Sequence, residues 1–273
     1  MDNLKIGKRI ALLRKKNGFT QEELAEKLEL SPQAISKWEN GHTLPETALL
    51  PLLSKLLNSS IDSILMPINV EIGDIIAFGK YRWCVLDTDG DMALIITENV
   101  IEERVFHSVN DIANKITWEH SDIRKYLNGE FYNNFSVEEK AKIAESKIVN
   151  LGNPWYGTRD YADTFDKIFL LSYEEVVRYF GDSGALENRR GIDKGVGCIF
   201  GDAIKDEYNK ARTALNLDGF NAWWWLRSQG GPRDHTTNDH VTAGSVDNVI
   251  WLCGDSVDRK DGGVRPALWL LCR

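Results

Sequence analysis

Long hydrophobic runs are missing from this sequence. No apolar stretch approaches the ~18 residues that a membrane-spanning helix requires. The first sixteen residues alternate apolar and basic side chains, and they lack the apolar core and the small-residue cleavage site of a secretory signal. These two absences argue against a membrane or secreted protein, so we expect a cytoplasmic chain that makes no membrane contact.

Cysteine is scarce, and closely spaced cysteine pairs are absent. The four cysteines form no CxxC motif; they are Cys84, Cys198, Cys253 and Cys272. In a cytoplasmic chain of this size, such isolated cysteines predict reduced and mostly buried thiols. The pattern does not favour a structural disulfide or a zinc site, and we expect no metal and no cofactor.

Familiar catalytic motifs are also absent. The sequence has no nucleophile elbow, no P-loop, no HExxH and no GxGxxG in a βαβ context. Two histidines and two aspartates gather in one segment: Asp234, His235, Asp239 and His240. Their spacing matches no established metal-ligand motif. We therefore predict that the protein is not an enzyme.

An excess of positive charge is missing from the chain as a whole but not from its first segment. The 33 basic and 41 acidic residues give a net charge of −8. Residues 1–66 carry nine basic and eight acidic side chains, and six of these basic residues precede residue 17; they are Lys5, Lys8, Arg9, Arg14, Lys15 and Lys16. Such asymmetry indicates nucleic-acid binding by the first segment, with the acidic remainder facing away from phosphates.

The character of the sequence changes near residue 67, which divides the 273 residues into two domains of ordinary size. Up to residue 66 the apolar residues recur at helical spacing, as expected for five short helices without a strand. Beyond it, glycine, aromatic and β-branched residues become frequent. We predict an all-α domain at 1–66, a short linker, and an α+β domain with a mainly antiparallel sheet at 70–273.

Helix start signals place two short helices close together in the first domain. Thr20 and Glu23 form a capping box, in which each residue satisfies the other's free backbone N–H. Ser31 and Pro32 supply an N-cap and a proline at the first helical position. The second of two such helices can lie in the major groove of DNA while the first braces the backbone.

These helices carry the sequences TQEELAEKL (20–28) and SPQAISKWENG (31–41). They closely resemble the Cro/XRE helix-turn-helix repressor family, and the resemblance extends from residue 4 to residue 65. It implies that Gln21 contacts a phosphate and that Gln33 and Lys37 reach base edges, where glutamine suits adenine and lysine suits guanine. It also implies backbone contacts from Ser36 and Asn40.

The same resemblance implies a structural ion pair between Arg14 and Glu39, and a homodimer that reads half-sites about one DNA turn apart. Two other interpretations stay open. Gln33 and Lys37 also fit an ordinary solvated helix face, and the helices could serve a protein interaction.

The second domain alternates short strand patterns with a few helix signals. An Asp89-Gly90 hairpin turn joins two of the strand patterns. The predicted strands are 72–78, 81–87, 92–98, 168–172, 223–227, 241–246, 249–253 and 264–271. The predicted helices are 121–129, 136–146 and 173–179. Ser136 begins a capping box for the second of them, and Ser172 caps the third.

Four motifs in this domain carry a second resemblance: TWEHSDIR (117–124), FLLS (169–172), WWLRS (224–228) and GVRPALW (263–269). Together they resemble a bacterial domain described as DUF6273. The last two also resemble the closing strands of C-type-lectin-like and formylglycine-generating-enzyme-like folds. We expect Arg227 and Arg265 to be buried, each paired with a carboxylate or capping backbone carbonyls.

Most tryptophans of this domain are expected in the core. A candidate ligand surface is the polar loop 228–242 beside Trp223, with the loop 152–161 and its Trp155, Tyr156 and Arg159 as a rim. We predict a sequence-specific DNA-binding transcriptional regulator, a repressor, whose C-terminal domain senses a small molecule or mediates assembly. The alternative is a carbohydrate- or protein-binding C-terminal module that the helical domain localises. A third interpretation is an enzyme similar to the formylglycine-generating group.

Overall fold

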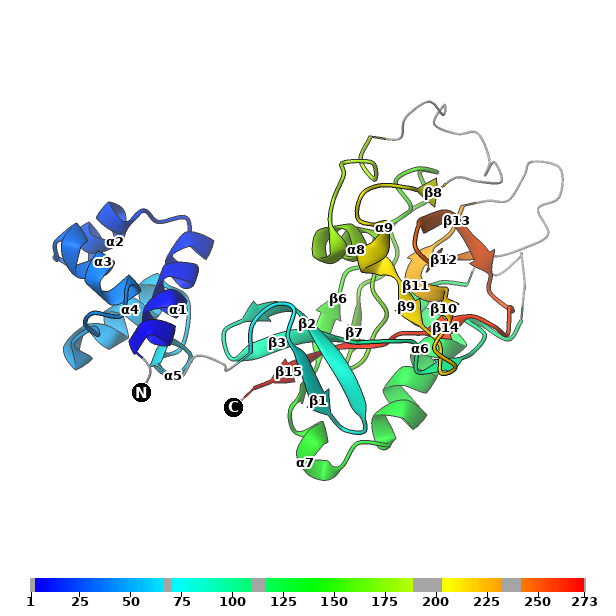
Figure 1. Ribbon diagram of the computed structural model, residues 1–273, viewed down its shortest axis with the longest axis horizontal. Coiled ribbons are helices and arrows are strands. Elements are labelled where there is room, and N and C mark those ends of the chain that lie inside the picture. The colour runs from blue at the N-terminus through cyan, green and yellow to red at the C-terminus, as the bar shows by residue number, and fades with distance from the viewer. Residues whose placement is uncertain (1–2, 66–69, 110–115, 189–202, 232–241, 273) are drawn as a thin grey trace. The chain divides into compact units, whose positions relative to one another are not determined.

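The computed structural model describes residues 3–65, 70–109, 116–188, 203–231 and 242–272 (Figure 1). The chain forms two compact units. The first contains the residues up to 71 together with 88–93 and 271–273, and the second contains 72–87 and 94–270. Among the described residues, no helix has the length and apolar character that crossing a membrane requires.

The N-terminal part is helical. Its elements are α1 (Asn3–Lys16), α2 (Gln21–Lys27), α3 (Pro32–Glu39), a 3₁₀ turn η1 (Thr47–Leu49), α4 (Leu50–Leu56) and α5 (Ile61–Leu65). Both predicted caps are confirmed: Thr20 and Glu23 form the capping box of α2, and Ser31 caps α3. The helices enclose one apolar core, made of Ile6, Ile10, Leu13, Leu24, Ala25, Leu28, Ile35, Trp38, Leu53, Leu57 and Ile64.

Two glycines let α1 approach the end of α3 closely. A Cβ atom built on Gly7 would lie 2.1 Å from the carbonyl oxygen of Trp38, which is backbone and cannot rotate away. Gly41 follows α3 with a φ of 72°, and a Cβ there would lie 2.7 Å from the Cα of Leu4. Only residues without a Cβ fit at these two positions.

We therefore expect Gly7→Ala to lower the free energy of unfolding of the helical domain by about 1–3 kcal/mol, the usual effect of overpacking. Alanine gains up to about 1 kcal/mol of helix propensity over glycine, but the backbone clash outweighs it. Amide hydrogen exchange in the full chain would measure the loss. Gly129→Ala is a matched control, because a Cβ there meets nothing within 4 Å; equal effects of the two variants would contradict the packing argument.

A five-stranded sheet brings the last strand of the chain into its interior. The strand order is β1-β2-β3-β15-β5. The strands are β1 (Ile75–Phe78), β2 (Tyr81–Asp89), β3 (Met92–Thr97), β5 (Ile143–Ala144) and β15 (Ala267–Leu271). The pairs β1–β2 and β15–β5 are antiparallel. The predicted hairpin turn lies between β2 and β3, where Gly90 has a φ of 65°.

A six-stranded sheet holds the WWLRS motif. Its order is β4-β14-β11-β12-β13-β8, and only the β11–β14 pair among its described pairings is parallel. The strands are β4 (Glu102–Glu103), β8 (Ala203–Ile204), β11 (Trp224–Gln229), β12 (Thr242–Val246), β13 (Ile250–Ser256) and β14 (Gly263–Val264). Two ribbons complete the strands: β6 (Ser146–Ile148) with β7 (Thr164–Asp166), and β9 (Ala214–Leu215) with β10 (Asn221–Ala222).

Short helices connect these strands. They are η2 (Trp118–His120), α6 (Asp122–Tyr126), the π-helical turn η3 (Leu127–Phe131), α7 (Val137–Lys140), α8 (Tyr173–Phe180) and α9 (Asn209–Arg212). The predicted capping box at Ser136 is confirmed, and so is the predicted cap at Ser172, which forms a capping box with Glu175. The predicted helix 136–146 is wrong beyond Lys140, because Ile143 pairs with Leu270 of β15 instead.

The predicted strand 168–172 is also wrong as a strand, since its only ladder contact among described residues is a bridge between Phe169 and Ala267. Ile168 to Leu171 are nonetheless fully buried, which explains their apolar run. Cys253 is disulfide-bonded, so the expectation of reduced thiols is wrong for this residue, whereas Cys84 and Cys272 are free. Isolated cysteines in a sequence give no sign of which of them meet in the fold.

Candidate functional site

Helix α3 presents two polar side chains on its exposed face. Ile35 and Trp38 anchor the helix in the core, where both are buried. Gln33 and Lys37 are exposed, and their i,i+4 spacing places them one above the other on the same face. Because the core fixes the helix on one side and the Ser31 cap fixes its start, the two side chains form a defined polar strip.

Ser36 and Asn40 lie on the same face of α3 and are hydrogen-bonded to each other. The Asn40 amide donates to the Ser36 carbonyl oxygen at 2.8 Å and to the Ser36 hydroxyl at 3.4 Å. Asn40 is also the C-cap of α3. These bonds fix the orientation of the Asn40 amide at the helix end.

Gln21, at the start of α2, belongs to a small network around Glu39. The expected ion pair is confirmed: Arg14 donates to the two carboxylate oxygens of Glu39 at 2.6 and 3.0 Å. The Gln21 amide donates to the same carboxylate at 2.6 Å. Arg14 also donates to the carbonyl oxygen of Phe19 at 2.7 Å, so it joins α1 to the start of α2 and the end of α3.

This network holds its carboxylate in the charged form. Burial alone would raise the pKa of Glu39, but hydrogen bonds from Arg14 and Gln21 and the positive charges of Arg14 and Lys15 outweigh it, and the pKa lies below its usual value. The hydrogen bond from Glu39 in turn raises the pKa of Arg14. Both groups are therefore charged at neutral pH.

The basic cluster before residue 17 is smaller at the surface than its sequence indicates. Arg9 and Arg14 are buried, with 6% and 7% of their surface exposed. The exposed members are Lys5, Lys8, Lys15 and Lys16. Lys15 lines a surface depression together with Gly18, Thr20 and Gln21, next to the first turn of α2. Positive charge thus lies beside the residue expected to contact a phosphate.

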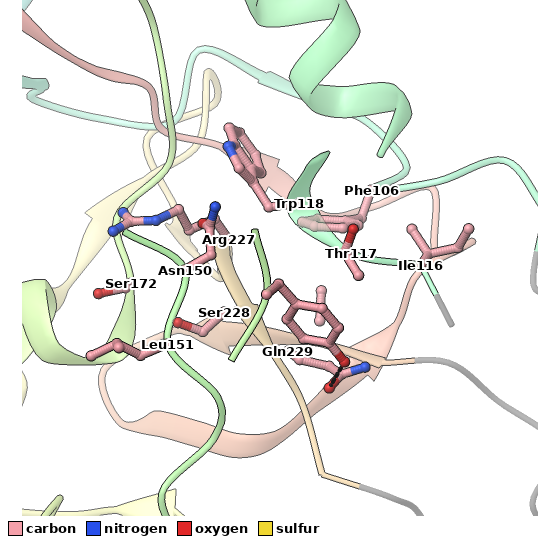
Figure 2. A pocket seen from close by; sticks show the side chains of 12 residues that line it. Phe106, Ile116, Thr117, Trp118, Asn150, Leu151, Ser172, Arg227, Ser228 and Gln229 are labelled. Carbon is pink, nitrogen blue, oxygen red and sulfur yellow. Dashed lines mark hydrogen bonds between the residues drawn. The ribbon is translucent and has the colours of Figure 1, made fainter. Parts of the chain in front are cut away.

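The C-terminal unit contains a pocket beside β11. Figure 2 shows it between the end of that strand and the segments that contain Phe106, Trp118 and Asn150. Its described lining residues are Phe106, Ile116, Thr117, Trp118, Asn150, Leu151, Tyr161, Ser172, Arg227, Ser228, Gln229 and Ala243. Sequence reasoning missed it because these residues come from seven separate segments, although Tyr161, Ser228 and Gln229 belong to the loops predicted as a ligand surface.

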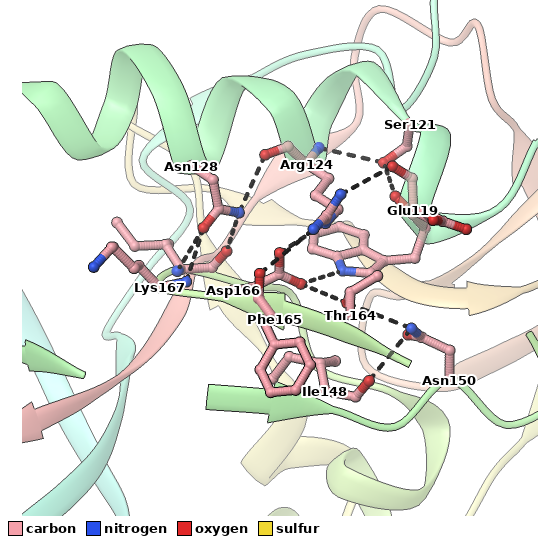
Figure 3. A network of polar contacts seen from close by, with 12 residues as sticks. Glu119, Ser121, Arg124, Asn128, Ile148, Asn150, Thr164, Phe165, Asp166 and Lys167 are labelled. Atoms are coloured by element: carbon pink, nitrogen blue, oxygen red, sulfur yellow. Dashed lines mark hydrogen bonds and ion pairs between the residues drawn. The ribbon is translucent and has the colours of Figure 1, made fainter. Parts of the chain in front are cut away.

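A buried polar network borders the pocket (Figure 3). Asp166 is 1% exposed and accepts hydrogen bonds from Trp118 at 2.8 Å, Arg124 at 2.7 Å and Thr164 at 2.7 Å. Asn150 joins the network through Thr164, at 3.5 Å. The network therefore fixes Trp118 and Asn150, two walls of the pocket.

Both predicted buried arginines are confirmed. Arg227 pairs with Glu175, and Arg265 donates to the carbonyl oxygens of Thr97 at 2.9 Å and Glu98 at 3.1 Å. Burial lowers the pKa of Arg265 to about 10, so it remains charged at neutral pH.

One residue of the predicted rim is buried, and part of the predicted ligand surface lies outside the described residues. Trp155 is 7% exposed and donates to the carbonyl oxygen of Leu186, so the prediction that it forms a rim is wrong. Tyr156 contacts the sulfur of Cys253 at 3.2 Å. Residues 232–241, with the candidate ligands Asp234, His235, Asp239 and His240, lie outside the described residues.

Two family models match the chain. The helix-turn-helix model matches residues 10–64, and the model described as a domain of unknown function, DUF6273, matches residues 90–271. The expected Cro/XRE-type helical domain and DUF6273 domain are thus both confirmed. Together the matches place a helical domain before a β-rich one with antiparallel sheets.

Several curated proteins are similar over the helical domain. The HTH-type transcriptional activator BcrR of Enterococcus faecalis is 39% identical over 23% of this chain and 30% of its own length. The HTH-type transcriptional regulator ImmR of Bacillus subtilis is 40% identical over 23% of this chain and 49% of its own. The chain thus spans less than half of the length of each of these two relatives.

Two solved structures have limited similarity to parts of the chain. The clp gene regulator ClgR from C. glutamicum is 27% identical to this chain, with a TM-score of 0.23. The similar region covers 24% of this chain and 86% of the ClgR chain. Apo-HppE is 17% identical to this chain, with a TM-score of 0.22. The similar region covers 38% of this chain and 65% of the HppE chain. Neither TM-score is high enough to support a conclusion about the fold or function of this chain. Because the DUF6273 model matches residues 90–271, which are two thirds of the chain, the chain belongs to the DUF6273 family. A Cro/XRE-type helix-turn-helix domain precedes the DUF6273 domain.

Proposed function

We propose that the protein is a sequence-specific DNA-binding transcriptional regulator. The observation that carries this proposal is the exposed pair of Gln33 and Lys37 on a capped, core-anchored α3, within a domain whose relatives are described as transcriptional regulators. Both side chains are long enough to reach base edges, and their neighbours Ile35 and Trp38 hold the helix rigidly behind them.

Affinity would come from a different set of groups. The exposed lysines of α1 and the start of α2 beside Gln21 supply the phosphate contacts, which position the domain without reading sequence. One domain of this size buries little surface, so we propose a homodimer that reads two half-sites about one turn apart. Repression is the expected mode of regulation.

The proposal predicts the outcome of a binding-site selection with the full chain. Wild-type protein should enrich a palindromic site. Gln33→Ala with Lys37→Ala should weaken binding to that site by about 30-fold or more, because two base contacts are lost and each contributes about 1–3 kcal/mol. Weak, salt-sensitive binding to unrelated DNA should persist in the variant, since it rests on phosphate contacts.

Lys55→Ala is the control, because it removes an exposed positive charge from α4, outside the helix-turn-helix. If it weakens specific binding as much as the double variant does, the effect is one of net charge and the assignment of base contacts fails. If wild-type protein enriches no site, with or without added ligand, the regulator proposal fails.

For the C-terminal domain we propose a binding role without catalysis, in which a bound small molecule alters the affinity of the helical domain for DNA. A C-type-lectin-like core remains our proposal for its fold. The pocket in Figure 2, where aromatic and polar side chains from distant segments meet, supports ligand sensing over a purely structural role.

A further inference from the structure

Strand β1 forms one outer edge of the five-stranded sheet, and among the described residues β2 is its only neighbour. The carbonyl oxygen of Asp74, just before β1, accepts from the Val85 N–H of β2 at 2.9 Å. Backbone groups alternate in direction along an antiparallel strand. The N–H and C=O groups of Ile75 and Ala77 therefore point away from β2, on the side where no described strand pairs with β1.

The other edge strands of the two large sheets are protected against pairing, whereas β1 is not. Within the described ranges these edges are β4, β5 and β8, and each has only two residues. Both residues of β4 are glutamates, and Lys142 and Lys205 adjoin β5 and β8. Short length and charge are devices that keep a sheet edge from pairing with another chain. In contrast, β1 has four residues, none of them charged.

The exposed side chains along this edge are apolar. Ile75 is 41% exposed, and Ile72, just before the strand, is 66% exposed. Ala77 is exposed as well, and Ile76 on the opposite face is half-buried. An uncharged edge with exposed apolar side chains is a template to which another extended strand can add.

Charges of opposite sign lie at the two ends of β1. Asp74 precedes the strand and Lys80 follows it, and both are exposed. The four residues of β1, at about 3.4 Å each, keep the two side chains apart within one copy. If two β1 strands pair antiparallel about a twofold axis, the Asp74 end of one meets the Lys80 end of the other. The edge is therefore complementary in charge to a second copy of itself.

We propose that β1 pairs antiparallel with β1 of a second copy of this chain, with Ile76 of one copy opposite Ile76 of the other. In this register Ile75 of each copy faces Ala77 of the other, so their outward N–H and C=O groups bond to each other. Lys80 then lies diagonally across from Asp74 of the second copy, within reach of a long side chain. This inference rests on the homodimer of the proposed function and assigns it a surface that is self-complementary, as twofold symmetry requires.

The test is analytical ultracentrifugation of the full chain without DNA, up to about 100 μM, because a strand pair of this size buries little surface and supports only a weak dimer. Wild-type protein should dimerise. Ile75→Lys should weaken the dimer by about tenfold or more, since it places two positive charges diagonally across the twofold axis. Leu217→Lys is the matched control: Leu217 is 79% exposed between β9 and β10, and the same change of charge there should leave the dimer intact. Both variants should unfold at the wild-type temperature, since both side chains are exposed.

A charge exchange tests the register independently. Asp74→Lys and Lys80→Asp should each weaken the dimer by about fivefold, because each variant sets like charges against each other across the axis. Combining them should restore most of the wild-type affinity. Losses that simply add in the double variant would show that the two side chains do not meet, and the proposed register would be wrong.

Two results would overturn the proposal altogether. One is a wild-type chain that stays monomeric at about 100 μM, a concentration that detects micromolar dimers. The other is a dimer that Ile75→Lys leaves intact, which would place the interface elsewhere, such as on the helical domain. Failure of the regulator proposal is distinguishable from both. A chain that dimerises through β1 but enriches no DNA site keeps this inference and loses the regulator, and a chain that enriches a palindrome while Ile75→Lys stays dimeric does the reverse.

Discussion

Arg14→Met is expected to lower the free energy of unfolding of the helical domain by about 3–5 kcal/mol, because it leaves a buried carboxylate without its cation. The side chains of Arg14 and Glu39 are each only 8% exposed, so water cannot replace the lost partner. A domain of this size has only about 3–9 kcal/mol of stability in total. The variant should therefore be largely unfolded in its first 65 residues and should not bind DNA.

Hydrogen exchange of peptides from residues 3–65 in the full chain would measure this loss locally. Lys15→Met is the control, since Lys15 is exposed and its replacement should change stability by less than about 0.5 kcal/mol. Adding Glu39→Leu to Arg14→Met should restore part of the stability, because the unpaired charge is then removed. If the double variant is no more stable than Arg14→Met, the effect comes from packing and the electrostatic argument is wrong.

Asp166→Ala is expected to destabilise the C-terminal domain by about 3 kcal/mol, since three donors lose one buried acceptor. Trp118 and Thr164 are left without a charged partner inside the protein (Figure 3). Arg124, whose side chain is 24% exposed, can still reach water, which keeps the effect toward the lower end of the range for buried ion pairs. For a domain of this size the loss corresponds to a fall of about 6–12 °C in unfolding temperature.

Thermal unfolding followed by circular dichroism would measure the change. Asp163→Ala serves as the control: Asp163 is three residues earlier, pairs with Lys147 at 2.8 Å, and has 35% of its side chain exposed. An exposed pair of this kind contributes little. Similar unfolding temperatures for the two variants would show that the network does not stabilise the domain.

The helical domain was predictable because its signals are local. The capping box at Thr20 and Glu23, the Ser31-Pro32 start of α3 and the apolar spacing around Ile35 each act within a few residues, and the structure contains all of them. The Arg14–Glu39 pair joins residues 25 apart, and only the resemblance to a known family indicated it.

The C-terminal domain was less predictable because its decisive contacts join distant residues. The segment after Lys140 has a helical pattern, yet Ile143 pairs with Leu270 of β15, more than 120 residues later in the sequence. The pocket depends on Asn150 and Arg227, 77 positions apart by their numbers. Buried arginines at Arg227 and Arg265 could be foreseen from the motifs, but not which of their nitrogens would be left unpaired.

The position of β15 between β3 and β5 has a consequence for synthesis on the ribosome. The helical domain uses contacts within its first 65 residues, so it can fold as soon as they leave the exit tunnel. The five-stranded sheet cannot close until residues 267–271 have emerged, and until then β3 and β5 lack their shared neighbour. A nascent chain stalled before residue 267 should therefore carry a folded helical domain ahead of an unfinished sheet with two open strand edges, which is the state most in need of a chaperone.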